Sequence, residues 1–323
     1  MFFSIHGSLF TFHVLFMNAL AKMKQIAALF EKSGIEDSAR EAEMLITGLL
    51  DIDRAGLYAG DAGIPEDRAK HIDDLAVRRT RGEPIQYLIG HVPFYGLTIY
   101  VGSGVLIPRP ETELLVDEVI KRLKRRIGET ESRSKDKVKG HGADSPAPRL
   151  ADSISILDLC TGSGCIAISI ARHFPDATVY GVDASEGAMV YATQNALANN
   201  VNNICFKLGD LFEPVNTLHF DCIVSNPPYV RHDEIKTLQR EIREHEPLSA
   251  LDGGRDGLDF YRRIFRDAPA YLQDNGIIML EIGFGQSAAI QELALSAGFT
   301  QMRFLKDFAG IERIFTAKLP REC

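Results

Sequence analysis

The chain lacks tryptophan entirely, holds only five cysteines among 323 residues and carries no excess of positive charge. The cysteines are odd in number and show neither paired CxxC spacing nor a nearby histidine cluster. These absences argue against a disulfide scaffold and a zinc site, so we expect free thiols and no metal. A net charge of −8 argues against a protein that grips duplex nucleic acid over its whole surface. We therefore expect no stable nucleic-acid partner.

A long uninterrupted hydrophobic run is also missing. The apolar stretch from Met1 to Ala21 is broken by His6, Gly7 and His13, and no Lys or Arg precedes it. It is too short and too interrupted for a membrane span, and it lacks the basic start of a signal peptide. We expect a cytoplasmic protein with no membrane partner. Residues 1–16 are interpreted as an extension upstream of the natural start.

The chain is 45% hydrophobic and 25% charged, which is ordinary for a globular protein. Its length favours two domains. Residues 17–82 show helical spacing of apolar residues and predict a small helical domain. Ser38 and Glu41 form the pattern of a capping box at a second helix, and Pro65 precedes a third. No ionisable cluster suggests chemistry here, so we interpret residues 17–82 as a packing or docking module.

The segments that follow residue 82 differ from the helical domain in their amino-acid pattern. Residues 83–108 predict a β-hairpin linker, with strands at Leu97–Val101 and Val105–Ile107 around a glycine-rich turn. Residues 109–126 predict a helix that leads into the second domain, with Pro110 in its first turn. Residues 127–152 are polar and rich in Lys, Ser, Gly and Pro, so they are interpreted as a flexible insertion without regular structure.

From residue 153 to 323, strands and helices alternate, which indicates an α/β domain with a parallel, Rossmann-like sheet. The last two strands, at 301–305 and 313–317, are too close in sequence for a helical crossover and should be antiparallel. The other expected strands are 154–159, 178–182, 204–208, 220–224 and 277–282, and the expected helices are 165–174, 186–198, 258–272 and 286–296.

Three successive strand ends carry residues suited to a nucleotide. Glycines in Asp158–Gly164 let the backbone approach a ligand at a helix start. Asp183 stands nineteen residues past Gly164, the spacing at which an acid binds ribose hydroxyls. Asp210-Leu211-Phe212 could hold an adenine by a carboxylate and an apolar ring. Because Gly162–Ala167 also satisfies GxGxxA, a dinucleotide-dependent oxidoreductase stays open at this point.

Asn226-Pro-Pro-Tyr229 follows an apolar run that predicts a buried strand. The prolines stiffen the loop and remove two N–H donors. Asn226 Oδ1 and the Pro227 carbonyl can then form a rigid pair of acceptors for one NH2 group, and Tyr229 adds an aromatic face. Such a loop suits a planar amide or an exocyclic amine. Together with the terminal strand pair, it weighs against NAD and matches an S-adenosylmethionine-dependent methyltransferase.

The chain resembles the HemK/PrmC family, the protein-(glutamine-N5) methyltransferases of peptide-chain release factors, from about residue 20 to 318. Asn-Pro-Pro-Tyr alone is also similar to amino-methyltransferases that act on adenine or guanine, so the combination of segments points to glutamine. The segments that carry the resemblance are Arg81–Gly90, Gly104–Glu113, Asp158–Ala167, Asn226–Tyr229 and Asp256–Arg263.

The resemblance implies a role for each part. Residues 153–323 would be the S-adenosylmethionine-dependent methyltransferase domain, which acts on the glutamine in the Gly-Gly-Gln loop of release factors 1 and 2, and residues 17–82 would dock the body of the release factor. The enzyme would act as a monomer. Substrate binding is implied for Asn226, Pro227, Pro228 and Tyr229, and catalysis for Asn226, Pro227 and Tyr229. The residues implied for the cofactor are Cys160, Thr161, Gly162, Ser163, Gly164, Asp183, Asp210, Leu211, Phe212 and Asn226.

The chain departs from the family pattern at three places. Cys160 stands where the family usually has glycine, Leu211 where some members carry an aromatic residue, and the 127–152 insertion is longer than usual. Two further classes stay open: an amino-methyltransferase that flips a nucleic-acid base into the same pocket, and a binding module without catalysis.

Overall fold

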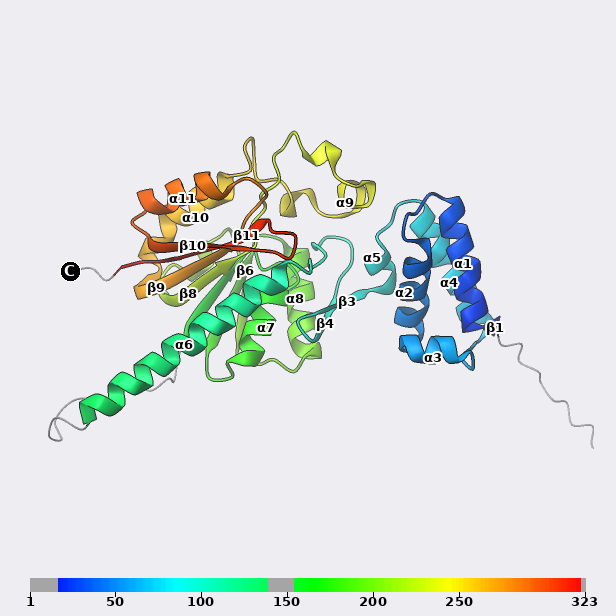
Figure 1. The fold of residues 1–323 in the computed structure, drawn as a ribbon, viewed down its shortest axis with the longest axis horizontal. Coiled ribbons are helices and arrows are strands. Elements are labelled where there is room, and N and C mark those ends of the chain that lie inside the picture. The colour runs from blue at the N-terminus through cyan, green and yellow to red at the C-terminus, as the bar shows by residue number, and fades with distance from the viewer. Residues whose placement is uncertain (1–16, 139–153, 321–323) are drawn as a thin grey trace, which may run out of the picture. The chain divides into compact units, whose positions relative to one another are not determined.

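A computed structural model describes residues 17–138 and 154–320 (Figure 1). The expected extension at 1–16 lies outside these residues. The described chain forms two compact units that divide between Ile89 and Gly90, and each is described separately.

The N-terminal unit is helical, as predicted. Its second helix begins at Ser38, but the expected capping box is wrong, because the N-cap is Asp37, which forms no side-chain cap, and Ser38 is already the first helical residue. Glu41 accepts a hydrogen bond from Arg79 Nε at 2.5 Å. Ile26, Phe30 and Leu45 are among the residues of its hydrophobic core. The elements are β1 (Met17–Asn18), α1 (Ala19–Lys32), α2 (Ser38–Leu50), α3 (Arg54–Ala59), β2 (Gly63–Ile64), α4 (Glu66–Thr80) and α5 (Ile85–Ile89).

A β-hairpin opens the second unit, but its strands differ from the predicted ones. β3 (His91–Phe94) pairs antiparallel with β4 (Leu97–Tyr100), and residues 105–107 are not a strand. The two residues between the strands, Tyr95 and Gly96, have φ values of 48° and 73°. Positive φ at both central residues is the backbone of a tight two-residue hairpin turn. The turn therefore lies at Tyr95-Gly96 rather than at residues 102–104.

Helix α6 (Thr112–Val138) runs well beyond the predicted end at residue 126. Residues 127–138, which were expected to lack structure, thus form part of a helix. No proline interrupts the sequence between Pro110 and Pro146, and this stretch is rich in Glu, Lys and Arg, which favour helix. The rest of the expected insertion, 139–152, lies outside the described residues.

A seven-stranded sheet forms the middle of this unit, and its order is β10-β11-β9-β8-β5-β6-β7. The predicted fold class is confirmed, since five strands run parallel, β11 is antiparallel to its neighbour β9, and β10 pairs antiparallel with β11. The strands are β5 (Ser155–Leu159), β6 (Thr178–Asp183), β7 (Ile204–Leu208), β8 (Phe220–Ser225), β9 (Leu272–Glu281), β10 (Thr300–Lys306) and β11 (Glu312–Lys318).

Helices cover both faces of the sheet (Figure 1). α6, α7 (Cys165–His173) and α8 (Glu186–Ala198) cover one face, and α10 (Asp259–Asp267) and α11 (Ser287–Ser296) cover the other. α10 is shorter than the predicted helix at 258–272, because a 3-10 turn at Ala268–Ala270 ends it and β9 already begins at Leu272. A short helix, α9 (Arg240–His245), was not predicted. Within residues 17–138 and 154–320, no helix is long and apolar enough to cross a membrane.

The strand order creates the place for a ligand. β5 lies between β6 and β8, so the chain leaves β5 in one direction and later returns on its other side. In open parallel sheets, ligands bind at such a reversal, outside the carboxyl ends of the strands. The loop after β5 and the Asn226 loop after β8 therefore meet at one edge, and Ser225 Oγ joins the two strands by donating to the Leu159 carbonyl at 2.7 Å.

Candidate functional site

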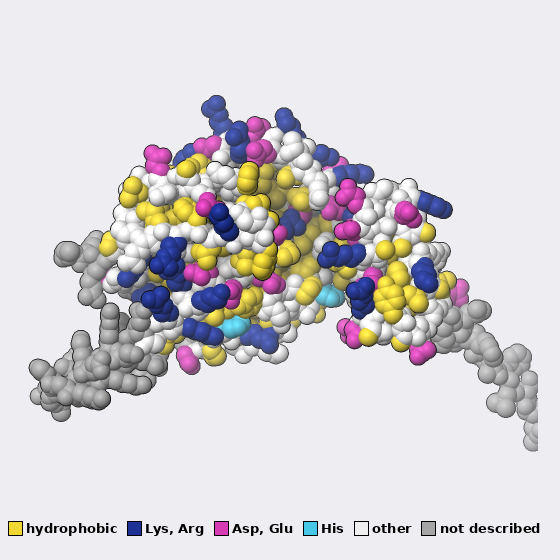
Figure 2. Space-filling model, viewed as in Figure 1, with side chains coloured by type: hydrophobic (Ala, Val, Ile, Leu, Met, Phe, Trp, Pro, Cys, Tyr) yellow, Lys and Arg dark blue, Asp and Glu magenta, His cyan; other side chains and the backbone are white. Residues whose placement is uncertain are grey.

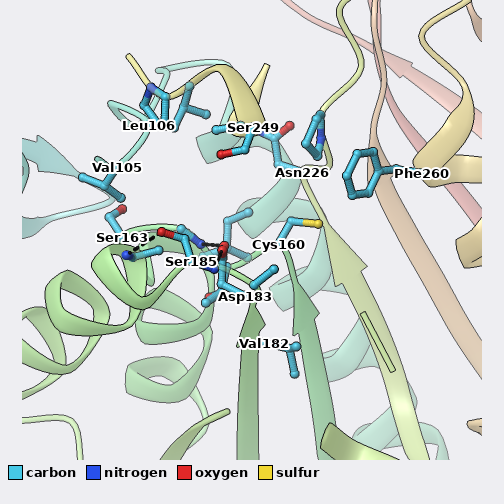
Figure 3. Close-up of a pocket in the computed structure, with 18 of the residues that line it drawn as sticks. Val105, Leu106, Cys160, Ser163, Val182, Asp183, Ser185, Asn226, Ser249 and Phe260 are labelled. Carbon is cyan, nitrogen blue, oxygen red and sulfur yellow. Dashed lines mark hydrogen bonds between the residues drawn. The ribbon is translucent and has the colours of Figure 1, made fainter. Parts of the chain in front are cut away.

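A cavity of about 600 Å³ lies at this edge of the sheet (Figure 3). Its floor consists of Cys160–Ser163 after β5, Asp183–Ser185 after β6 and Gly209–Leu211 after β7. Asn226 and Pro228 line it from the β8 side. The three strand ends that were singled out in the sequence are thus brought together around one space.

The loop after β5 is shaped by left-handed backbone conformations. Cys160, Gly162 and Gly164 have φ values of 57°, 56° and 79°. Cys160 therefore adopts a conformation that favours glycine. A Cβ on Gly162 would meet no other atom within 4 Å, so space for a ligand is open there. Gly164 does not line the cavity and begins helix α7 behind it.

Asp158 supports this loop from below. Its Oδ2 accepts hydrogen bonds from Thr161 Oγ1 at 2.5 Å and from the Ala167 N–H at 3.2 Å. Its other oxygen, Oδ1, is buried and has no partner among the described residues. Burial, opposed by the two hydrogen bonds, raises the pKa of Asp158 to about 7.

Asp183 links the loop to the end of β6. Its Oδ2 accepts from the Gly162 N–H at 2.8 Å and its Oδ1 from the Ser185 N–H at 2.9 Å (Figure 3). Burial raises the pKa of Asp183, while these backbone N–H groups act in the opposite direction. An acid that lines the cavity in this fixed orientation can accept hydrogen bonds from the hydroxyl groups of a ribose.

The third strand end supplies two of its three expected residues. Asp210 and Leu211 line the cavity, and Asp210 accepts a hydrogen bond from Arg263 at 2.6 Å. Phe212 instead lies in the hydrophobic core, where its ring stacks on Tyr271 at 4.5 Å between centroids. The aromatic ring at the cavity is that of Phe260 from α10, which the sequence did not single out as a ligand contact (Figure 3).

The Asn226–Tyr229 loop presents only part of itself to the cavity. Asn226 and Pro228 line it, whereas Pro227 and Tyr229 do not. Asn226 Nδ2 donates to Thr112 Oγ1 at 3.2 Å. The Tyr229 hydroxyl donates to Glu281 Oε1 at 3.1 Å, and burial raises the pKa of Tyr229. The tyrosine thus anchors the loop from behind.

Two residues that the sequence analysis missed complete this arrangement. Thr112, at the start of α6, lines the cavity and donates from Oγ1 to Glu281 Oε2 at 2.6 Å. Glu281 is buried at the end of β9. Its signal in the sequence is the one that identified Asp183: an acid that follows an apolar strand at the carboxyl edge of the sheet.

Arg109 and Glu246 join the two segments that lie across the cavity from its floor. The buried Glu246 carboxylate accepts from the Ile107 N–H at 3.1 Å and from Arg109 Nη2 at 2.5 Å. Both segments line the cavity, the first with Gly104, Val105, Leu106, Pro108 and Arg109 and the second with Pro247, Ser249 and Ala250. One carboxylate therefore holds together two parts of the wall that are 137 residues apart in sequence.

Two family models match this chain. Residues 145–248 match the family described as methyltransferase small domain, and residues 22–90 match the PrmC N-terminal domain. A solved protein-(glutamine-N5) methyltransferase (release factor-specific) from Alicyclobacillus acidocaldarius is 27% identical, with a TM-score of 0.38, over 69% of this chain and 99% of that one.

Curated relatives match over nearly their whole length. The release factor glutamine methyltransferase of Thermodesulfovibrio yellowstonii is 45% identical over 298 residues, which cover 92% of this chain and 97% of the relative. The protein of the same name from Geobacter sulfurreducens is 37% identical and covers 89% of this chain and 92% of the relative. The resemblance drawn from the sequence motifs is thereby confirmed, and the chain belongs to the release factor glutamine methyltransferase family.

Proposed function

We propose that this enzyme transfers a methyl group from S-adenosylmethionine to the side-chain nitrogen N5 of the glutamine in the Gly-Gly-Gln loop of peptide-chain release factors 1 and 2. The observation that carries the proposal is the position of Asn226. It lines the same cavity as Gly162 and Asp183, in a chain 45% identical to a release factor glutamine methyltransferase.

The cavity fits the methyl donor. Its volume of about 600 Å³ lies in the range that holds cofactor-sized ligands. Asp183 and Asp210 supply acceptors for hydroxyl and amine groups, and Cys160–Ser163, Leu211 and Phe260 supply the surface around them. Bound there, S-adenosylmethionine supplies an electrophilic methyl group on a positively charged sulfur.

The protein must make a poor nucleophile react, because an amide nitrogen shares its lone pair with the carbonyl group. Asn226 Oδ1 accepts one N–H of the substrate amide, and the Pro227 carbonyl is our candidate for the second acceptor. Two acceptors orient the nitrogen and stabilise the positive charge that develops on it. Good alignment alone can lower a barrier by roughly 7–11 kcal/mol. The proton leaves after methyl transfer, through these acceptors or water.

The other parts of the chain have supporting roles in this proposal. The helical domain at residues 17–82 docks the body of the release factor, and its match to the PrmC N-terminal domain supports this assignment. The enzyme works as a monomer in the cytoplasm, where translation supplies its substrate.

Mass spectrometry tests the function directly. Release factor incubated with enzyme and S-adenosylmethionine should gain one methyl group on the Gly-Gly-Gln glutamine, whereas DNA and RNA should gain none. Asn226→Ala should lower kcat far more than it weakens S-adenosylmethionine binding. Methylation of a nucleic-acid base instead of the protein would show that the proposed substrate is wrong.

A further inference from the structure

A buried chain of hydrogen bonds runs from Glu281 to the cavity wall. Glu281 Oε2 accepts from Thr112 Oγ1 at 2.6 Å, and Thr112 Oγ1 accepts from Asn226 Nδ2 at 3.2 Å. Glu281 and Thr112 are only 2% exposed, so water does not compete for these bonds. The three residues come from β9, α6 and the loop after β8, and the whole chain lies within the second unit.

The chemistry of the first member decides the direction of every bond. Burial raises the pKa of Glu281, and the hydrogen bonds from Thr112 and Tyr229 act in the opposite direction; in its ionised form the carboxylate can only accept hydrogen bonds. A hydroxyl has one proton. Because Thr112 donates that proton to Glu281, it can only accept a hydrogen bond from Asn226. The side of the asparagine amide that faces Thr112 must therefore be the NH2 group. The structure has this orientation, with Asn226 Nδ2 directed at Thr112 Oγ1.

The second oxygen of Glu281 strengthens the constraint. Oε1 accepts from the Tyr229 hydroxyl at 3.1 Å, so both carboxylate oxygens already have donors. The Glu281 carbonyl accepts from the buried Tyr261 hydroxyl at 2.8 Å, which fixes the end of β9 itself. Glu281 thus holds the Asn-Pro-Pro-Tyr loop at two points, through Thr112 to Asn226 and directly to Tyr229.

We propose that Glu281 is a positioning residue that acts through Thr112 to point Asn226 Oδ1, and not its NH2 group, at the substrate. The inference rests on the proposed function and adds a basis for selectivity. An acceptor in this place forms a hydrogen bond with the NH2 of a glutamine side chain but repels the oxygens of a glutamate. An enzyme with the amide reversed would lose both catalysis and this preference.

Isosteric substitutions test the idea. In Glu281→Gln, the new NH2 group can donate to Thr112, whose proton then turns to Asn226 Oδ1 and reverses the amide. Thr112→Val removes the relay, whereas Thr112→Ser keeps it and serves as the matched control. We expect kcat to fall about ten- to a hundred-fold in the first two variants and by less than about three-fold in Thr112→Ser. S-adenosylmethionine affinity should stay near wild type, whereas the melting temperature should fall in Thr112→Val, which leaves a buried carboxylate oxygen of Glu281 without its donor.

Selectivity provides a readout that a purely structural role would not change. A release factor carrying glutamate at the Gly-Gly-Gln position should compete poorly with the glutamine form for the wild-type enzyme. The ratio of the two affinities should shrink at least five-fold in Glu281→Gln and stay unchanged in Thr112→Ser. An unchanged ratio and an undiminished kcat in Glu281→Gln would overturn the proposal.

Neutron diffraction from deuterated crystals separates this inference from the proposed function. The deuterons of the Asn226 amide should face Thr112 in the wild type and the cavity in Glu281→Gln. Wild-type deuterons that face the cavity would refute the positioning role even if release factor is methylated. Deuterons that face Thr112 in an enzyme without activity on release factor would support the positioning of Asn226 and show that only the substrate assignment failed.

Discussion

A Cβ added to Gly253 would lie 2.8 Å from the Cα of Tyr229. The same atom would lie 2.9 Å from the Pro228 carbonyl oxygen and 2.9 Å from the Cα of Gly257. These neighbours are backbone atoms, which cannot turn aside as a flexible side chain can. The Gly253 N–H also donates to the Val230 carbonyl at 2.8 Å. The segment that begins at Gly253 therefore packs directly against the back of the Asn-Pro-Pro-Tyr loop.

Gly253→Ala should displace that loop while leaving the floor of the cavity in place. We expect kcat for release factor to fall at least about ten-fold, because small displacements of aligned groups are costly in catalysis. S-adenosylmethionine affinity, measured by calorimetry, should change less than two-fold. Gly128→Ala is the control, since a Cβ there meets nothing within 4 Å and helix α6 favours alanine. Full activity in Gly253→Ala would mean that the loop tolerates the shift.

The Asp183 carboxylate is expected to govern cofactor affinity. In Asp183→Asn, an NH2 group replaces one of the two oxygens that now accept from Gly162 and Ser185, so a donor faces a donor. Losing a charged hydrogen bond costs roughly 1.5–3 kcal/mol, so the Kd for S-adenosylmethionine should rise about ten- to a hundred-fold. Asp210→Asn should have a smaller effect, because its side chain is more exposed and already paired with Arg263. Titration calorimetry measures both, and equal effects would contradict this order.

Glu246 should matter for the wall of the cavity and hence for the protein substrate. Glu246→Ala leaves the Ile107 N–H without its carboxylate partner and frees Arg109. We expect kcat/KM for release factor to fall about ten-fold, with a smaller loss in Glu246→Gln, which keeps an acceptor. Glu244→Ala, two residues away, removes only exposed ion pairs with Arg240 and Arg243 and should leave kinetics unchanged. Matching losses in the Glu244 and Glu246 variants would exclude a specific role for Glu246.

Several features of the fold and of the location of the site depend on the local sequence pattern and were predicted correctly. Alternating apolar segments identified the parallel strands, and acids or glycines at strand ends identified Cys160–Gly162, Asp183 and Asp210 as neighbours at one edge. The two-residue turn at Tyr95-Gly96 was missed, because a positive φ can be predicted from the presence of glycine but not from the presence of tyrosine. The helical continuation after residue 126 was missed because a polar, exposed helix lacks the apolar periodicity on which helix prediction depends.

Contacts between distant segments could not be read from the sequence. Phe212 follows a strand end like Asp210 does, yet packing on Tyr271 draws it into the core. Tyr229 was expected to face the substrate amide, but a buried carboxylate 52 residues away holds its hydroxyl. Nothing in the local sequence of Thr112 indicates that its hydroxyl joins Asn226 to Glu281. Partners of this kind depend on which elements the tertiary fold places side by side.

The buried Asp158 should give the stability of this protein a distinct dependence on pH. Burial raises its pKa to about 7, above the ordinary value of 3.8 that applies to the unfolded chain. Between these values the folded state keeps a proton that the unfolded state releases, so the contribution to stability falls as pH rises from about 4 to about 7 and then levels off. At 1.36 kcal/mol per unit, the change is at most about 4 kcal/mol.

Asp158→Asn mimics the protonated form and should lack this contribution. Its unfolding free energy relative to wild type should therefore increase as pH rises from 5 to 8, as measured by denaturant titration at each pH. Asp176→Asn, an exposed site on the same domain, should follow the wild-type curve. A constant difference between Asp158→Asn and wild type across this range would show that Asp158 stays ionised in the fold. Its unpartnered Oδ1 would then carry buried charge beneath the cofactor loop.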